Sequence, residues 1–105
     1  MTPSQGMAEF FAMEANEYLT RLDALVSAGG TPDATEFVRL ARALRGSALM
    51  ANQQRIAASA GGLEAFARAL KDTRLTWDAA NRQIGIRAVD DLKRQGQVNG
   101  ADMHA

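Results

Sequence analysis

The sequence predicts an all-α protein, an antiparallel up-and-down bundle of four helices. Three observations predict this fold. Apolar residues recur at steps of three and four along four segments, short breaks separate the segments, and no segment alternates apolar and polar residues as a half-buried strand does. Short connections favour antiparallel neighbours. The chain has 105 residues, of which 47% are hydrophobic, and this corresponds to one domain with a sizeable core.

The first two helices are expected at residues 7–28 and 34–50. The first has an apolar stripe at Phe11, Ala15, Tyr18, Leu22 and Leu25, flanked by Met7 and Val26, and Gly29-Gly30 ends it. Asp33 is the expected N-cap of the second helix, with Glu36 placed to complete a capping box. The buried stripe of the second helix is expected to comprise Phe37, Leu40, Ala41, Leu44 and Ala48.

The other two helices are expected at residues 54–71 and 77–94. Gly61-Gly62 interrupts the third helix at a cost of about 1 kcal/mol per glycine, which predicts either a close approach of another helix or a bend. Thr76 is the expected cap of the fourth helix, with apolar positions at Trp77, Ala80, Ile84, Ala88 and Leu92. Five aromatic residues are expected to close the core: Phe10, Phe11, Phe37, Phe66 and Trp77. The bundle thus covers residues 7–94, between a flexible lead at 1–6 and a flexible tail at 95–105.

Composition narrows the classes of protein to consider. The absence of cysteine excludes disulfides and thiolate metal sites and fits a reducing compartment. No apolar run approaches the roughly 20 residues needed to cross a bilayer, and residues 1–6 lack the features of a signal peptide. We therefore expect a cytoplasmic protein that has no membrane partner, no metal and no cofactor.

The formal net charge is zero, but the charges are segregated along the chain. Residues 1–38 hold six acids and one base, whereas residues 39–74 hold seven bases and two acids. Two explanations are open: acidic and basic helices neutralise each other by packing side by side, or the middle of the chain offers a cationic surface to an acidic partner.

The outer face of the second helix is the candidate for such a surface. At 100° per residue, Arg42 lies about 160° from the buried Leu44. Val38, Arg45 and Leu49 are spaced to flank Arg42, and Arg39, Arg42 and Arg45 form a basic stripe. A solvated helix face is the alternative explanation for these arginines.

The second and third predicted helices together resemble a known family. Residues 37–48, which include Leu44-Arg45-Gly46-Ser47-Ala48, are similar to the signature of histidine phosphotransfer (HPt) domains, roughly apolar-x-x-x-A-H-x-L-K-G-S-A. The third helix follows in register through Ile56, Ser59-Ala60 and Leu63-Glu64, and residues 10–19 resemble the opening helix of the HPt domains that begin chemotaxis-type kinases. The resemblance spans about residues 7–94. It implies an HPt-like four-helix bundle of bacterial two-component signalling, where such domains act in phosphorelays.

The sequence departs from this family at the reactive position. The phosphorylated histidine of the signature falls on Arg42, and the only histidine in the chain is His104, in the predicted tail. A guanidinium stays protonated at physiological pH, so it offers no nitrogen lone pair to attack a phosphoryl group. The sequence therefore predicts a pseudo-HPt domain that is not an enzyme and has no catalytic residue.

The resemblance implies a partner, namely the receiver domain of a response regulator or a histidine kinase. Receiver domains present an acidic, magnesium-binding pocket, and in the family the residue at Arg45 is a base near the phosphoryl group. The position of Gly46 leaves room for the partner, although close helix packing explains a glycine there equally well. The expected partner-binding residues are Val38, Arg39, Arg42, Arg45, Gly46 and Leu49.

Three other classes of protein compete with this one. A structural or dimerisation bundle would bury Val38 and Leu49 against a second copy, which leaves a monomer or a weak homodimer open. Nucleic-acid binding is disfavoured by the zero net charge and by the lack of aromatic residues among the arginines. An enzyme is disfavoured because no catalytic triad, metal cluster or phosphate loop is visible. The chain is either free-standing or the first domain of a larger chemotaxis-type kinase.

Overall fold

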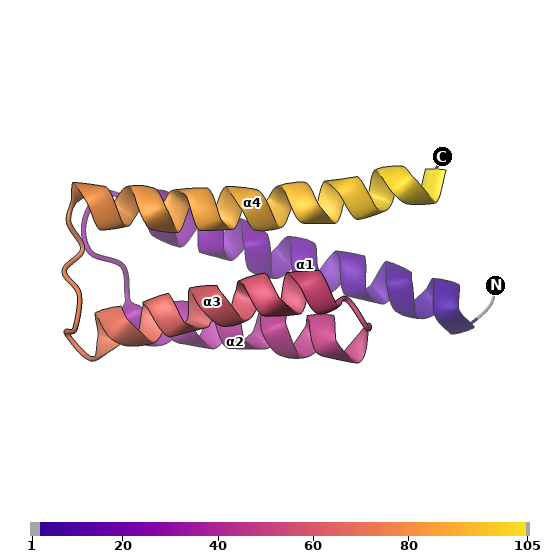
Figure 1. The fold of residues 1–105 in the computed structure, drawn as a ribbon, viewed down its shortest axis with the longest axis horizontal. Helices are drawn as coiled ribbons and strands as arrows, with labels where there is room; N and C mark the ends of the chain where they lie inside the picture. Colours follow the sequence, from indigo (N-terminus) through magenta and orange to yellow (C-terminus); the bar gives the residue numbers. More distant parts are fainter. Residues whose placement is uncertain (1–2, 105) are drawn as a thin grey trace.

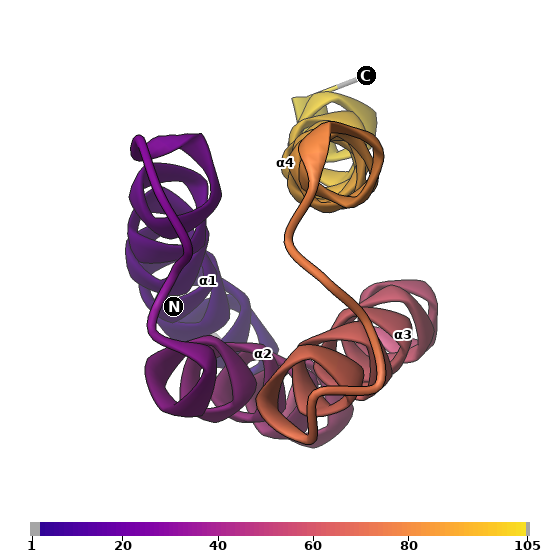
Figure 2. The same ribbon diagram turned by 90° about the vertical axis from the view of Figure 1, so that its left-hand side faces the viewer.

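The computed structural model describes the backbone of residues 3–104 and the side chains of residue 6 and residues 9–96. Four helices form an antiparallel bundle: α1 (Pro3–Ser27), α2 (Ala34–Met50), α3 (Gln54–Lys71) and α4 (Ala79–His104). Each helix packs against the two next to it in the order α1, α2, α3, α4 and back to α1 (Figures 1 and 2). The all-α, up-and-down four-helix architecture predicted from the sequence is confirmed.

The boundaries of α2 and α3 agree with the prediction, and local hydrogen bonds explain them. Gly30, in the connection between α1 and α2, has a φ of 114°, a backbone conformation that glycine adopts more readily than other residues. The Asp33 carboxylate accepts a hydrogen bond from the backbone N–H of Glu36 at 3.2 Å, so Asp33 is the N-cap, as expected. Glu36 does not close a capping box, because its carboxylate pairs with Arg39 instead.

The start of α4 differs from the prediction. The helix begins at Ala79, and Asp78, not Thr76, caps it: its Oδ1 accepts a hydrogen bond from the backbone N–H of Asn81 at 2.8 Å. Trp77 lies in the connection before the helix. Its ring makes edge-to-face contacts with Phe37 and Phe66, with centroids 6.3 and 6.2 Å away. The packing of this ring against α2 and α3 sets the conformation of the connection. The position of Trp77 in the periodic apolar pattern of α4 does not.

The terminal helices are longer than the periodic pattern predicted. α1 begins at Pro3 rather than at residue 7, and α4 continues past residue 94 to His104. Extending an existing helix costs little per residue, and no proline follows Pro32 to stop it. Residues 1, 2 and 105 lie outside the described residues, and the flexibility predicted for 1–6 and 95–105 stays a prediction.

The core follows the predicted stripes in α1 and α2, with corrections in α1 and α4. Phe10 is 65% exposed, because Phe11 next to it takes the inward position. In α4 the buried residues include Gly85, Val89 and Leu92, whereas Ile84 is 52% exposed, so the inward face is rotated from the predicted one. Gly85 lies against Trp77: a Cβ there would stand 3.0 Å from the indole Cη2.

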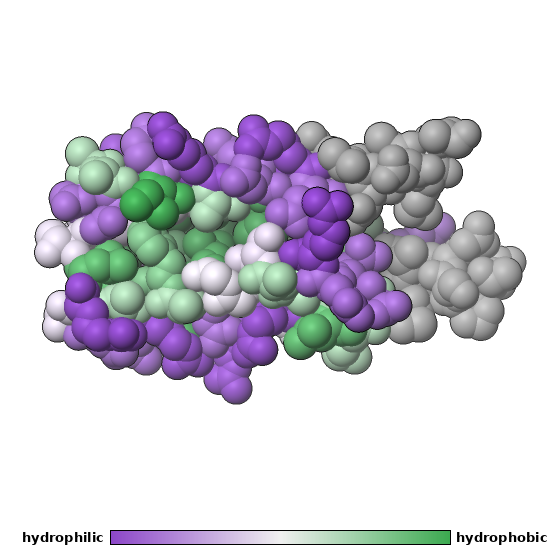
Figure 3. Space-filling view, in the orientation of Figure 1, coloured by the Kyte–Doolittle hydropathy of each residue, from purple (hydrophilic) through white to green (hydrophobic). Residues whose placement is uncertain are grey.

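Polar contacts attach α4 to α1 across the bundle. The Arg82 guanidinium donates to the Ser27 carbonyl at 2.9 Å and so satisfies the C-terminal end of α1, and Lys93 pairs with Asp23 at 3.3 Å. α3 and α4 meet less closely than α2 and α3. Figure 3 shows a band of apolar residues at the surface between α3 and α4. Within the described residues, no helix is both long enough and apolar enough to cross a bilayer.

Candidate functional site

The outward side of α2 is a stripe of exposed residues that follow one another at steps of three, four and one. We call it the α2 face, and it comprises Thr35, Arg39, Arg42, Gly46, Leu49 and Met50. Arg42 lies at its centre. Leu49 and Met50 are 55% and 82% exposed, so this end of the helix carries exposed apolar surface.

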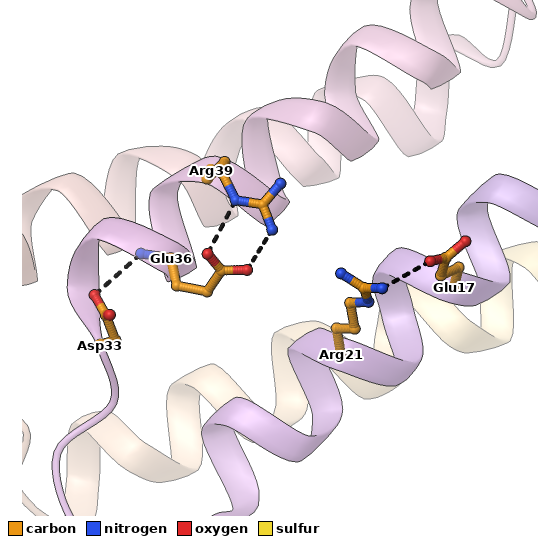
Figure 4. Close-up of polar contacts among 5 residues, drawn as sticks. All are labelled: Glu17, Arg21, Asp33, Glu36 and Arg39. Atoms are coloured by element: carbon orange, nitrogen blue, oxygen red, sulfur yellow. Dashed lines mark hydrogen bonds and ion pairs between the residues drawn. The ribbon is translucent and has the colours of Figure 1, made fainter.

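Arg42 is unpaired within the described part of the chain, where its guanidinium has neither an ion-pair partner nor a hydrogen-bond acceptor. Arg39, one turn earlier, differs: its Nε donates to Oε2 of Glu36 at 2.9 Å, with a second contact between the same two side chains (Figure 4). The hydrogen bond from Arg39 lowers the pKa of the exposed Glu36 carboxyl. The positive charge of Arg39 is therefore balanced locally, and that of Arg42 is not.

Arg45 was expected on the outer face beside Arg42, but its side chain turns towards α3. Its Nε donates to Oε1 of Glu64 at 2.8 Å, and Nη2 of Arg68 donates to Oε2 of the same carboxylate, also at 2.8 Å. The Glu64 side chain is only 8% exposed. The hydrogen bonds from Arg68 and Arg45 hold the pKa of Glu64 below its usual value, although burial acts to raise it. Arg45 therefore links two helices.

Val38 was also expected on the outer face of α2, and that placement is wrong. It is 8% exposed and belongs to the core. Val38 lies on the side of α2 that α3 covers, as Arg45 does two turns later. The apolar contact area of the α2 face therefore comes from Leu49 and Met50. Thus Arg39, Arg42, Gly46 and Leu49 lie together on the exposed surface, whereas Val38 is buried and the half-exposed Arg45 is paired with Glu64.

The glycines of α2 and α3 separate into two kinds. A Cβ added to Gly61 would lie 3.4 Å from Cδ of Arg45, so Gly61 gives room to the stem of that arginine. A Cβ added to Gly46 or Gly62 would have no atom within 4 Å. Packing inside this chain therefore does not require Gly46, which was one of its two proposed explanations. A solvent-facing glycine within a helix costs about 0.5–1 kcal/mol relative to alanine.

Sequence reasoning missed two features near this site. Glu64 was treated only as part of a motif, although a single acid among apolar residues with arginines at its helical neighbours predicts a buried ion pair. The exposure of Phe10 was also missed; adjacent phenylalanines in a helix lie 100° apart, so one of them turns away from the core. The side chain of His104, the last residue of α4, is not among the described side chains.

Comparisons with protein-family models, with curated proteins and with solved structures find no match to this chain. The function is therefore inferred from the α2 face itself and from the resemblance of residues 37–48 to the HPt signature.

Proposed function

We propose that this protein is an HPt-like docking module without a phosphoacceptor, which binds the receiver domain of a response regulator through the α2 face. One observation carries the proposal: Arg42, at the position of the HPt histidine, is exposed and unpaired at the centre of that face within the described part of the chain. The pattern in residues 37–48 supports the choice of partner.

The chemistry of Arg42 suits binding rather than transfer. Its guanidinium stays charged at physiological pH and cannot form the phosphoryl–nitrogen bond that a histidine forms. It presents several N–H donors in a fixed plane, an arrangement that binds carboxylates with two parallel hydrogen bonds. An acidic receiver pocket would accept such a group, so docking would occupy the receiver without passing phosphate.

The surroundings of Arg42 favour a close approach by another protein. Gly46 carries no side chain one turn away, and the space above it is open. Leu49 and Met50 offer exposed apolar surface at the end of the helix. Interfaces commonly combine an arginine at the centre with apolar contacts that exclude water around it.

The test is a titration of the full chain against receiver domains from the same genome by isothermal calorimetry. We expect one receiver to bind, and Arg42→Ala to weaken binding by about tenfold or more, because a charge-assisted hydrogen-bond pair is lost. Arg87→Ala is the matched control, since Arg87 is an exposed arginine on α4, and the described residues show no packing of α4 against α2. Failure of every receiver to bind, or equal effects of the two substitutions, would contradict the proposal.

A dimerisation bundle is the second candidate, and the exposure of Leu49 and Met50 favours it. Light scattering at micromolar concentration separates the two functions. A monomer that binds a receiver supports the docking module. A stable dimer that Leu49→Ser disperses, with no receiver bound, supports self-association. Transfer of radiolabelled phosphate from a kinase to this chain would contradict the loss of phosphotransfer.

A further inference from the structure

A groove runs between the first half of α1 and the last half of α2, on one flank of the α2 face. Its volume is about 530 Å³, and it is lined by Gly6, Phe10, Phe11, Glu14, Tyr18, Ala43, Ser47, Met50 and Ala51. This volume falls within the usual range for small-molecule sites, roughly 300–1,000 Å³. Three aromatic rings and Met50 make most of the lining apolar.

Among the described residues that line this groove, Glu14 alone has a charged side chain. Glu14 is half-buried, and within the described part of the chain its carboxylate has no ion pair and no hydrogen bond. Glu17, one turn further along α1, differs because it pairs with Arg21 at 2.9 Å (Figure 4). Tyr18 and Ser47 also line the groove, and among the described residues their hydroxyls make no hydrogen bond.

We propose that this groove binds a small organic cation, an amine or a guanidine carried on an apolar body. A carboxylate that is partly withdrawn from water gains most from a cation, and the faces of Phe10, Phe11 and Tyr18 attract the same charge. The apolar part of the ligand would cover carbon surface of Met50 and Ala43. An anion would meet the charge of Glu14, and a neutral ligand would leave that carboxylate without a partner.

This inference goes beyond the receiver-docking function and does not rest on it. Five of the nine lining residues come from α1; Met50 belongs to both the groove and the α2 face, but Arg42, on which docking depends, does not line the groove. Binding of a cation is measured on the chain alone, without a receiver. A negative result for cation binding therefore does not contradict receiver docking, and a negative result for docking does not contradict cation binding.

The experiment compares three probes of one shape and different charge: 3-phenylpropylamine, 3-phenylpropanol and 3-phenylpropanoate. Each is titrated into the ¹⁵N-labelled full chain while amide chemical shifts are recorded. We expect saturable shifts at Tyr18, Ala43, Ser47 and Ala51 with the amine, with binding about threefold to tenfold weaker for the alcohol and weakest for the carboxylate. The affinity of the amine should fall as salt is added.

Glu14→Gln keeps the shape of the side chain and removes its charge. We expect it to weaken the amine by about threefold to tenfold and to leave the alcohol unchanged. Glu17→Gln is the matched control and should leave both probes unchanged. Equal affinity for the amine and the alcohol in the unmodified chain, shifts located away from the groove, or full amine binding by the folded Glu14→Gln variant would each overturn the proposal.

Discussion

Two sides of α2 carry arginines three residues apart, and these arginines have different surroundings. Arg45 is held against α3 by Glu64, a carboxylate that is 8% exposed and that also binds Arg68. Arg42 points outward with no partner within the described residues, next to a glycine with open space above it. The side towards α3 is thus satisfied within the chain, and the outward side is not. The difference separates residues that build the bundle from residues that have no partner within the described part of the chain.

The largest effect expected from this comparison is on the satisfied side. Glu64→Ala removes a buried acceptor from both Arg45 and Arg68 and should lower the free energy of unfolding by about 2–3 kcal/mol. The loss stays below that of a fully buried ion pair because both arginines are 40–48% exposed and return to water. Urea denaturation followed by circular dichroism measures it.

The control for this substitution is Glu17→Ala, which removes one partner of an exposed pair with Arg21. Such pairs contribute at most about 1 kcal/mol, so the two variants should differ clearly. Equal losses would mean that Glu64 does not fix α3 to α2 as its burial indicates.

A second prediction concerns the free energy of unfolding at low pH, which depends on the pKa of Glu64. Because its pKa lies below the ordinary 4.5 in the folded state, the carboxylate contributes stability above that pH. This contribution is lost as the pH falls below 4.5 and through the lowered pKa of the folded state. Glu64→Gln should therefore show a shallower decline of unfolding free energy in acid than the unmodified chain. Parallel declines would assign the acid sensitivity to other carboxyls.

The smallest expected effect distinguishes the two open glycines. Gly46→Ala and Gly62→Ala should each raise the free energy of unfolding by about 0.5–1 kcal/mol, because a Cβ meets no atom within 4 Å at either position. Thermal unfolding measures this gain. Only Gly46→Ala should also weaken receiver docking, since Gly62 lies on α3, outside the α2 face. If Gly46→Ala binds the receiver as tightly as Gly62→Ala does, Gly46 does not serve docking.

Much of the fold was predictable from the sequence. Helical periodicity, Gly29-Gly30 and the cap at Asp33 located α2 and α3 at their observed bounds. Trp77 misled the prediction for α4. A large ring at a helical step from Ala80 fits the periodic pattern, but its burial against Phe37 and Phe66 is a tertiary effect that spacing alone does not contain.

The sequence predicted which residues of the candidate site face outward, but it did not predict which of them contact α3. The angle of 100° per residue placed Arg42 and Leu49 outward, as the structure has them. It did not show that α3 overlaps the edge of the same face and buries Val38, or that Glu64 stands opposite Arg45. Those facts depend on the distance and rotation between two helices, which the pattern of one helix does not specify.

The ring of Trp77, which lies against Gly85, also provides an intrinsic fluorescent probe of the bundle. Trp77 is the only tryptophan in the chain. Its indole Nε1 is buried and has no hydrogen-bond partner among the described residues, and the ring packs against Phe37 near the start of α2. Leu49 and Met50 lie at the opposite end of that helix. Fluorescence excited at the indole therefore reports the opening of the bundle at the end where α4 begins. Occupation of the α2 face around Leu49 should leave that emission almost unchanged.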